Sequence, residues 1–214
     1  MEVSKVIDTP IAIATRLDMD EAGSPINQTM YRGIIRSLWY LTTSRPNIVF
    51  SVGLCARFQS NTKESHLKAA KRILRYLKGT RDLVLFYPSG DSFDLIGCAD
   101  ADYAGYMVDK KSTSGMAHFR GSCLISWGTR KQNSMALSTT EDDIALNMAK
   151  NPIQHKRTKH IDVHHHFLRD NVEKGLICMK FCSTEDQIAD IFTKALSREH
   201  FEQNHLALGL INPN

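Results

Sequence analysis

The sequence predicts an α+β fold in which an N-terminal helical segment is followed by a sheet with flanking helices. From residue 29 to residue 82, apolar residues recur every three to four positions, as in helices that bury one face. From residue 83 they come in short runs separated by turn residues, which is typical of strands. Hydrophobic residues make up 42% and charged residues 23% of the 214 positions, which indicates a globular rather than a disordered chain.

The helical segment contains three predicted helices. The first has apolar positions at Ile34, Ile35, Leu38 and Leu41, and the second begins near Pro46, because proline suits a first helical turn. The third buries Leu67, Ala70, Leu74 and Leu77, and it ends at Gly79. Residues 1–28 show little periodicity and are predicted to be a tail or linker, so the helical segment spans 29–82.

Residues 83–214 are predicted to form the sheet domain. Strands are expected at 83–87, 93–99, 115–119 and 123–127, and the apolar run 93–99 is typical of a buried central strand. The later elements are a helix near 138–148, a longer element at 160–175, a strand at 176–181 and a helix from Ile188 through Ile191, Phe192 and Ala195.

Basic residues are concentrated on the third helix, although the net charge is only +4. Such a stripe fits phosphate backbones and predicts nucleic-acid contact, while an ordinary solvated helix face is the alternative. The contacting residues would be Lys68, Lys71, Arg72, Arg75 and Lys78. The four residues Arg72 to Arg75 also match the RxLR pattern of secreted effectors, which we interpret as a coincidence inside a helix.

Several features predict an intracellular protein, cytoplasmic or nuclear. No stretch approaches the ~18 apolar residues of a membrane span, so no membrane partner is expected. The N-terminus has no apolar core of a secretory signal, and we expect the protein not to be secreted. The five scattered cysteines are expected to be reduced thiols.

Three acidic residues on separate predicted elements are candidate metal ligands. Asp100 ends an apolar strand, Glu141 begins a helix, and Asp190 lies beside the apolar stripe of the last helix. Carboxylates that converge from separate elements suit Mg²⁺ or Mn²⁺, and a pair of such ions can clamp a phosphodiester. The alternative for Asp100 is an acid in a turn.

Seven blocks occur in an order that is similar to the C-terminal end of the Pol polyprotein of Ty1/copia-type LTR retrotransposons. They are YRGIIRSLWYLTTSRPNIVFSV, LKAAKRILRYLKGT, LIGCADADYAG, DKKSTSG, ISWGTRKQNSMALSTTE, AKNPIQHKRTKHIDVHHHFLRD and TEDQIADIFTKAL. The resemblance implies the tail of a reverse transcriptase followed by an RNase H-like domain, a mixed sheet with flanking helices.

The resemblance also implies roles for the three acids. Asp100 matches the first catalytic Asp, Glu141 the Glu of the S-x-x-E block, with Asp143 as a second candidate, and Asp190 the last catalytic Asp. The family's C-D-N-x-S-A block, which carries a further carboxylate, does not occur in this sequence. About forty residues of the family layout are missing near 142–149, which predicts a truncated sheet and impaired catalysis.

We therefore interpret the chain as a copia-type Pol fragment of RNase H ancestry. The ancestral reaction implied is Mg²⁺-dependent hydrolysis of RNA in an RNA–DNA hybrid, with Lys131, Gln132 and the basic helix along the nucleic-acid backbone. The rest of Pol is a candidate partner. A non-catalytic nucleic-acid-binding remnant and a non-functional pseudogene product are the alternatives.

Overall fold

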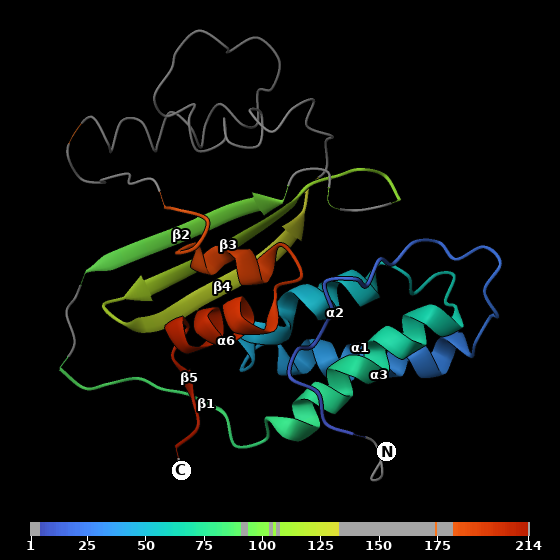
Figure 1. Ribbon diagram of the computed structural model, residues 1–214, viewed down its shortest axis with the longest axis horizontal. Helices are drawn as coiled ribbons and strands as arrows, with labels where there is room; N and C mark the ends of the chain where they lie inside the picture. The colour runs from blue at the N-terminus through green and yellow to red at the C-terminus, as the bar shows by residue number, and fades with distance from the viewer. Residues whose placement is uncertain are drawn as a thin grey trace, which may run out of the picture.

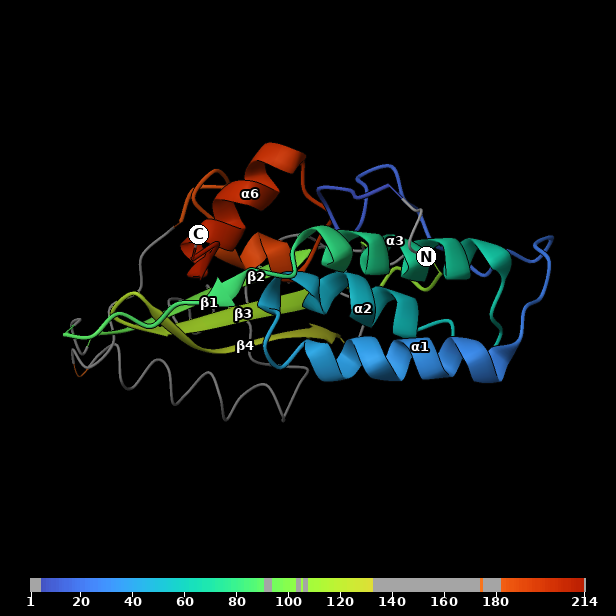
Figure 2. The same ribbon diagram turned by 90° about the horizontal axis from the view of Figure 1, so that it is seen from below.

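The computed structural model describes residues 5–90, 94–102, 105, 108–132, 174 and 182–213. Within these ranges the chain forms a helical layer from its N-terminal part and a sheet from its middle part (Figure 1). The C-terminal residues return over the sheet, as Figure 2 shows from below. The predicted α+β class is confirmed.

The helical layer consists of the three predicted helices. They are α1 (Gln28–Leu41), α2 (Val49–Ala56), which continues from the short 3-10 helix η1 (Pro46–Ile48), and α3 (Glu64–Gly79). The side chain of Asn27 caps α1 by accepting a hydrogen bond from the Met30 amide at 2.9 Å. At the start of α3, the Lys63 amide donates to His66 Nδ1 at 3.0 Å. These local contacts explain why the sequence pattern located the helices correctly.

The segment before α1 packs closely against the helical layer. Residues 5–27 form no helix or strand apart from a single bridge between Pro25 and Lys63. Ile11 and Leu17 are nevertheless buried, and His66 Nε2 lies 2.8 Å from the carbonyl oxygen of Asp18. The predicted linker is thus irregular in its backbone but is held by side-chain contacts.

Three antiparallel strands form the larger sheet. In the order β2-β3-β4 they are β2 (Leu95–Asp102), β3 (Thr113–Arg120) and β4 (Cys123–Lys131). A second, small sheet pairs β1 (Val84–Leu85) with β5 (Leu210–Ile211). The first four strands confirm the predicted positions, whereas β5 was not predicted.

One expectation for the sheet is wrong. The apolar run at 93–99 predicts a buried central strand, but β2 is the edge of the sheet within the described residues, and Leu95 and Ile96 are 76% and 51% exposed. An apolar run reports the composition of a strand and carries no information on its neighbours.

The end of the chain also differs from the prediction. The apolar spacing from Ile188 predicts one helix, but the structure has a short 3-10 helix, η3 (Ile188–Phe192), and then α6 (Arg198–Ala207). The side chain of Ser197 caps α6 by accepting from the His200 amide. The interruption allows η3 to lie across β2 and β3 while α6 packs on η3. The elements predicted at 138–148, 160–175 and 176–181 lie outside the described residues, apart from Lys174.

A single apolar core joins the helical layer and the sheet. It includes Leu38 and Ile73 from the helices, Ala117 from β3 and Phe192 from η3. The core therefore continues across residue 82, and the division into 29–82 and 83–214 stays a prediction. Among the described residues, no helix is long and apolar enough to cross a membrane.

Candidate functional site

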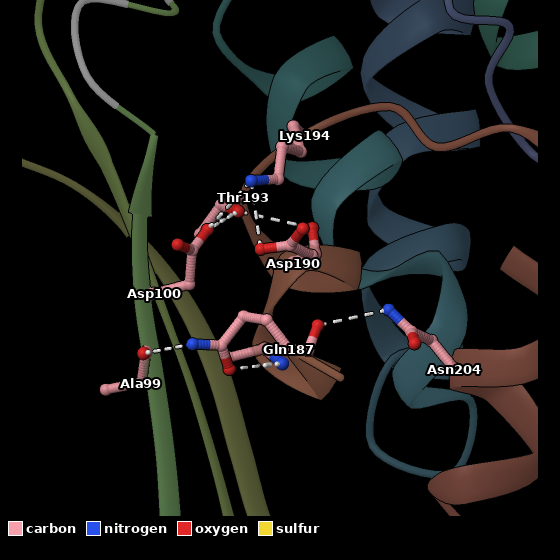
Figure 3. Close-up of polar contacts among 8 residues, drawn as sticks. Ala99, Asp100, Gln187, Asp190, Thr193, Lys194 and Asn204 are labelled. Atoms are coloured by element: carbon pink, nitrogen blue, oxygen red, sulfur yellow. Dashed lines mark hydrogen bonds and ion pairs between the residues drawn. The ribbon is translucent and has the colours of Figure 1, made fainter. Parts of the chain in front are cut away.

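Two of the predicted acids, Asp100 and Asp190, lie together at the contact between β2 and η3 (Figure 3). Thr193 Oγ1 donates a hydrogen bond to Asp100 Oδ2. The ammonium of Lys194 lies 2.9 Å from Asp190 Oδ1 and 3.7 Å from Asp100 Oδ2. The fold thus gathers a pair of carboxylates around one cation, from positions far apart in the sequence.

Gly115 makes this close approach possible. It pairs with Asp100 in the register of β2 and β3. A Cβ atom at Gly115 would lie 2.6 Å from Phe192 Cβ and 2.8 Å from Thr193 Cγ2. Because such distances are too short for carbon atoms, any side chain at this position would push η3 away from the sheet.

Gln187 fixes η3 relative to its neighbours. Its side-chain oxygen accepts from the Ala189 amide at 3.3 Å, and its Nε2 donates to the carbonyl oxygen of Ala99 at 3.1 Å. Asn204 of α6 donates to the backbone carbonyl of Gln187 at 3.3 Å (Figure 3). Gln187 therefore links β2, η3 and α6 beside Asp100, because Ala99 is the preceding residue.

The carboxyl group of Asp190 is almost completely buried, with 8% of its side chain exposed. Burial is the main cause that raises the pKa of Asp190 to about 6, and the nearby charge of Asp100 raises it further, while the hydrogen bond to Lys194 opposes both. For Lys194, burial lowers the pKa, but attraction by the two aspartates outweighs burial and leaves this pKa raised. The two carboxylates thus need a nearby positive charge.

Carboxylate oxygens are the ligands that Mg²⁺ and Mn²⁺ take in proteins, so the donor atoms of Asp100 and Asp190 suit such an ion. Asp190 Oδ1 also lacks a well-aligned hydrogen bond in its buried position, although it is ion-paired with Lys194. Within the described residues, no group of three Asp, Glu, His or Cys side chains is placed to hold a metal. The predicted third ligand, Glu141, and its alternative Asp143 lie outside those residues.

The predicted nucleic-acid-binding residues of α3 fall into two kinds. Lys68 and Lys71 are exposed, and Lys68 forms an ion pair with Glu64 at 3.0 Å. Arg72, by contrast, is partly buried and donates to both oxygens of Thr9 at 3.2 and 2.9 Å. Arg75 and Lys78 are also partly buried, and the Nε of Arg75 has no hydrogen-bond partner. The basic stripe is therefore only partly accessible.

Lys131 and Gln132 lie at the end of β4, at the same end of the sheet as Asp102. Lys131 Nζ is 2.6 Å from Asp109 Oδ2, and Gln132 Nε2 donates to Ser114 Oγ at 3.0 Å. Both residues are thus near the carboxylate pair along the sheet, but they are bonded to other groups. Their role in nucleic-acid binding stays a prediction.

Sequence reasoning found both described aspartates but missed the residues that hold them, which are Gly115, Gln187, Thr193 and Lys194. Thr193 and Lys194 stand in the same recognised block as Asp190 and were the available signal. Gly115 ends the recognised block DKKSTSG, and Gln187 stands in the same block as Asp190, but neither block shows their roles, which depend on packing and bonds between separate elements.

Comparison with known proteins relates the chain to transposon polyproteins. It is 33% identical over 246 residues to the retrovirus-related Pol polyprotein from transposon RE1 of Arabidopsis thaliana, with 98% of this chain and 17% of that protein covered. It is 32% identical over 247 residues to the corresponding protein from transposon RE2 of the same plant, with 99% and 17% covered. The chain thus spans about one sixth of the length of these relatives.

A shorter match involves the secreted RxLR effector protein 161 of Plasmopara viticola, with 36% identity over 115 residues, 53% of this chain and 80% of that protein. No protein-family model matches the chain, and no solved structure matches it.

The alignment lengths bear on the predicted internal deletion. The alignments with the two polyproteins run over 246 and 247 residues, although this chain has only 214. Both relatives therefore carry residues within the matched span that have no counterpart here, as a deletion in this chain requires.

Proposed function

The chain belongs to the family of copia-type retrotransposon Pol polyproteins, and we propose that it is a Pol fragment of RNase H ancestry, a reverse-transcriptase tail followed by an RNase H-like domain, with impaired hydrolytic activity. The observation that carries the proposal is the meeting of Asp100 and Asp190 around one cation. Each aspartate stands in its own sequence block, CADADYAG or ADIFTKAL, and the fold brings both blocks to one place.

Asp100 and Asp190 would hold Mg²⁺ or Mn²⁺, with Glu141 as the predicted third ligand. Divalent ions at such a site activate water and stabilise the leaving oxygen of a phosphodiester. Thr193 orients Asp100 through its hydrogen bond, and Gln187 keeps η3 at the correct distance from β2. The substrate class is RNA in an RNA–DNA hybrid.

Two observations support impaired hydrolysis. The sequence contains no C-D-N block for the further carboxylate that the family resemblance implies, and the relatives carry residues within the matched span that this chain lacks. A metal pair with one ligand fewer is held less firmly, because each divalent ion needs several oxygen ligands.

The test is cleavage of a labelled RNA–DNA hybrid by the purified chain in Mg²⁺, in Mn²⁺ and in EDTA. We expect specific binding of the hybrid with little or no cleavage. Metal-dependent cleavage that Asp100→Asn abolishes would support the hydrolase and contradict the impairment. Absence of both binding and cleavage, from a protein with a cooperative melt, would contradict the proposal as a whole.

A non-catalytic nucleic-acid-binding remnant is the second candidate, and the exposed Lys68 and Lys71 on α3 favour it. Their contribution is separable from that of the carboxylates because neither lysine touches the site. Replacing both by Gln would reduce the slope of log affinity against log salt by about one for every phosphate that the helix no longer neutralises. An unchanged slope would show that α3 does not bind the nucleic-acid backbone.

Two further interpretations are weaker. One is a non-functional pseudogene product that does not fold stably. The described residues share a continuous apolar core, which argues against it, so a cooperative thermal transition is expected. The relative named as a secreted RxLR effector suggests a different role. In this chain the RxLR letters lie in the middle of α3, where Arg72 is hydrogen-bonded to Thr9, so they do not form an accessible linear motif.

A further inference from the structure

Lys194 occupies the position between the two carboxylates that a divalent cation would also need. Its ammonium is 2.9 Å from Asp190 Oδ1 and 3.7 Å from Asp100 Oδ2, as the dashed lines of Figure 3 show. Lys194 directly follows Thr193, and Thr193 donates a hydrogen bond to Asp100. The site thus contains its own positive charge, supplied by the same turn that supplies Asp190.

A lysine ammonium and a divalent ion compete for these oxygens. Mg²⁺ binds carboxylate oxygens at about 2.0–2.1 Å, and it requires the lone pairs on which an ion-paired ammonium depends. Two positive centres within a few ångströms also repel each other, and burial strengthens this repulsion because the surroundings screen charge less than water does. The ammonium therefore has to leave before a divalent ion can bind both carboxylates.

A neighbouring pocket offers the side chain a place to go. The pocket has a volume of about 190 Å³, and its lining includes Thr193, Lys194 and Asp102 together with two basic residues, Arg16 and Arg57. Asp102 lies two residues after Asp100 on β2 and is close enough to contribute to the charge environment of Lys194. Because lysine has a flexible four-carbon stem, its ammonium can reach a second carboxylate without movement of the backbone.

We propose that Lys194 is an internal counter-ion that keeps divalent cations out of the Asp100–Asp190 pair and moves into the adjoining pocket when such a cation binds. The inference rests on the proposed function, because it concerns the same carboxylates. It adds a regulatory residue to the site, and its consequence is that metal affinity is limited by this lysine as well as by the number of carboxylates.

The test measures Mn²⁺ binding by isothermal titration calorimetry and by the electron paramagnetic resonance signal of free Mn²⁺. Lys194→Met should bind Mn²⁺ at least about tenfold more tightly than the wild type, since removal of about 1.4 kcal/mol of competition gives that factor. Lys194→Arg, which keeps the charge, should remain as weak as the wild type. Adding Asp190→Asn to Lys194→Met should abolish the gain.

Arg198→Met is the matched control, because Arg198 also forms ion pairs, with Asp8 and Glu202, outside the Asp100–Asp190 pair. It should leave Mn²⁺ affinity unchanged. Equal or weaker binding by Lys194→Met, in a protein with an unaltered circular dichroism spectrum, would overturn the inference. That outcome would mean that the ammonium does not compete with the metal.

A second measurement uses only the wild type, in case the variants fail to fold. Acetylation of lysines by acetic anhydride, mapped by mass spectrometry, should increase at Lys194 when Mn²⁺ is added and stay constant at Lys63, whose ammonium donates to the carbonyl oxygen of Gly23. No increase at saturating Mn²⁺ would overturn the inference. Binding and cleavage of the hybrid are measured separately. If Lys194→Met binds Mn²⁺ tightly but the chain neither binds nor cleaves the hybrid, the inference is supported and the proposed function fails.

Discussion

The helical layer and the sheet of this protein are stabilised in different ways. The helices bury large side chains from several directions, so Tyr31, Leu38, Ile48 and Val52 are completely inaccessible. Within the part of the chain that the structure describes, η3 and α2 pack on the sheet, and β2 at its edge leaves Leu95 76% exposed. Among these described residues, the helices therefore bury the larger side chains more completely, whereas the sheet supplies the position of Asp100.

The same contrast applies to the charged groups. In the helical layer Arg72 fastens the N-terminal segment through Thr9. In the sheet region the charged groups meet each other, as Lys194 does with Asp100 and Asp190. Arg72 in the first region therefore contributes to the fold, whereas Lys194 in the second region belongs to the candidate site.

The largest expected effect tests where the stabilisation resides. Leu38→Ala should lower the free energy of unfolding by about 2–5 kcal/mol, because it opens a cavity among fully buried side chains. Leu95→Ala removes the same atoms from the exposed end of β2 and should change the free energy of unfolding by less than about 0.5 kcal/mol. Both free energies can be measured by urea unfolding, with circular dichroism as the signal. Equal losses of stability would contradict the comparison of the two regions.

A smaller effect is expected at the contact between the sheet and η3. Gly115→Ala should cost about 1–3 kcal/mol, because its Cβ would overlap Phe192 and Thr193. It should also weaken Mn²⁺ binding by moving Asp190 away from Asp100. Gly128→Ala on β4 is the control, since the nearest atom to its Cβ would be 4.0 Å away. If Gly115→Ala is as stable as Gly128→Ala, the close approach of η3 does not position the site.

The third prediction concerns α6, which connects the two regions through the edge-to-face contact of Phe201 with Tyr76. Burial lowers the pKa of His205 on this helix from 6.5, while Glu202 opposes the shift, and the His205 Nδ1 has no hydrogen-bond partner. The folded state therefore binds fewer protons than the unfolded state near pH 6. The stability that this group contributes is present above pH 6.5 and is lost as the pH falls.

Melting temperatures at about pH 8 and about pH 5 test this prediction. His205→Leu should reduce the loss of stability on acidification, because the variant has no buried imidazole to protonate. His200→Leu replaces an exposed histidine on the same helix and should retain the pH dependence of the wild type. If the melting temperature of His205→Leu falls between the two pH values as much as that of the wild type, other groups cause the loss of stability in acid.

Much of the secondary structure was predictable because its signals are local. Pro46 in η1 and Gly79 at the end of α3 mark helix ends within a few residues, and the turn at 120–122 separates β3 from β4. The helix expected from Ile188 failed for a tertiary reason. The spacing of its apolar residues is helical, but packing against Gly115 and the bonds of Gln187 favour one short 3-10 segment there.

The sequence by itself determined the order of the three helices and the first four strands, the family, and the two aspartates on separate elements. Only the tertiary structure decided that β2 lies at the edge of the described sheet, that Arg72 is bonded to Thr9, and that Lys194 sits between the carboxylates. The physical reason is the range of the interactions. Periodicity and capping act within one or two turns, whereas the bond from Thr193 to Asp100 joins residues 93 positions apart and exists only once the chain is folded.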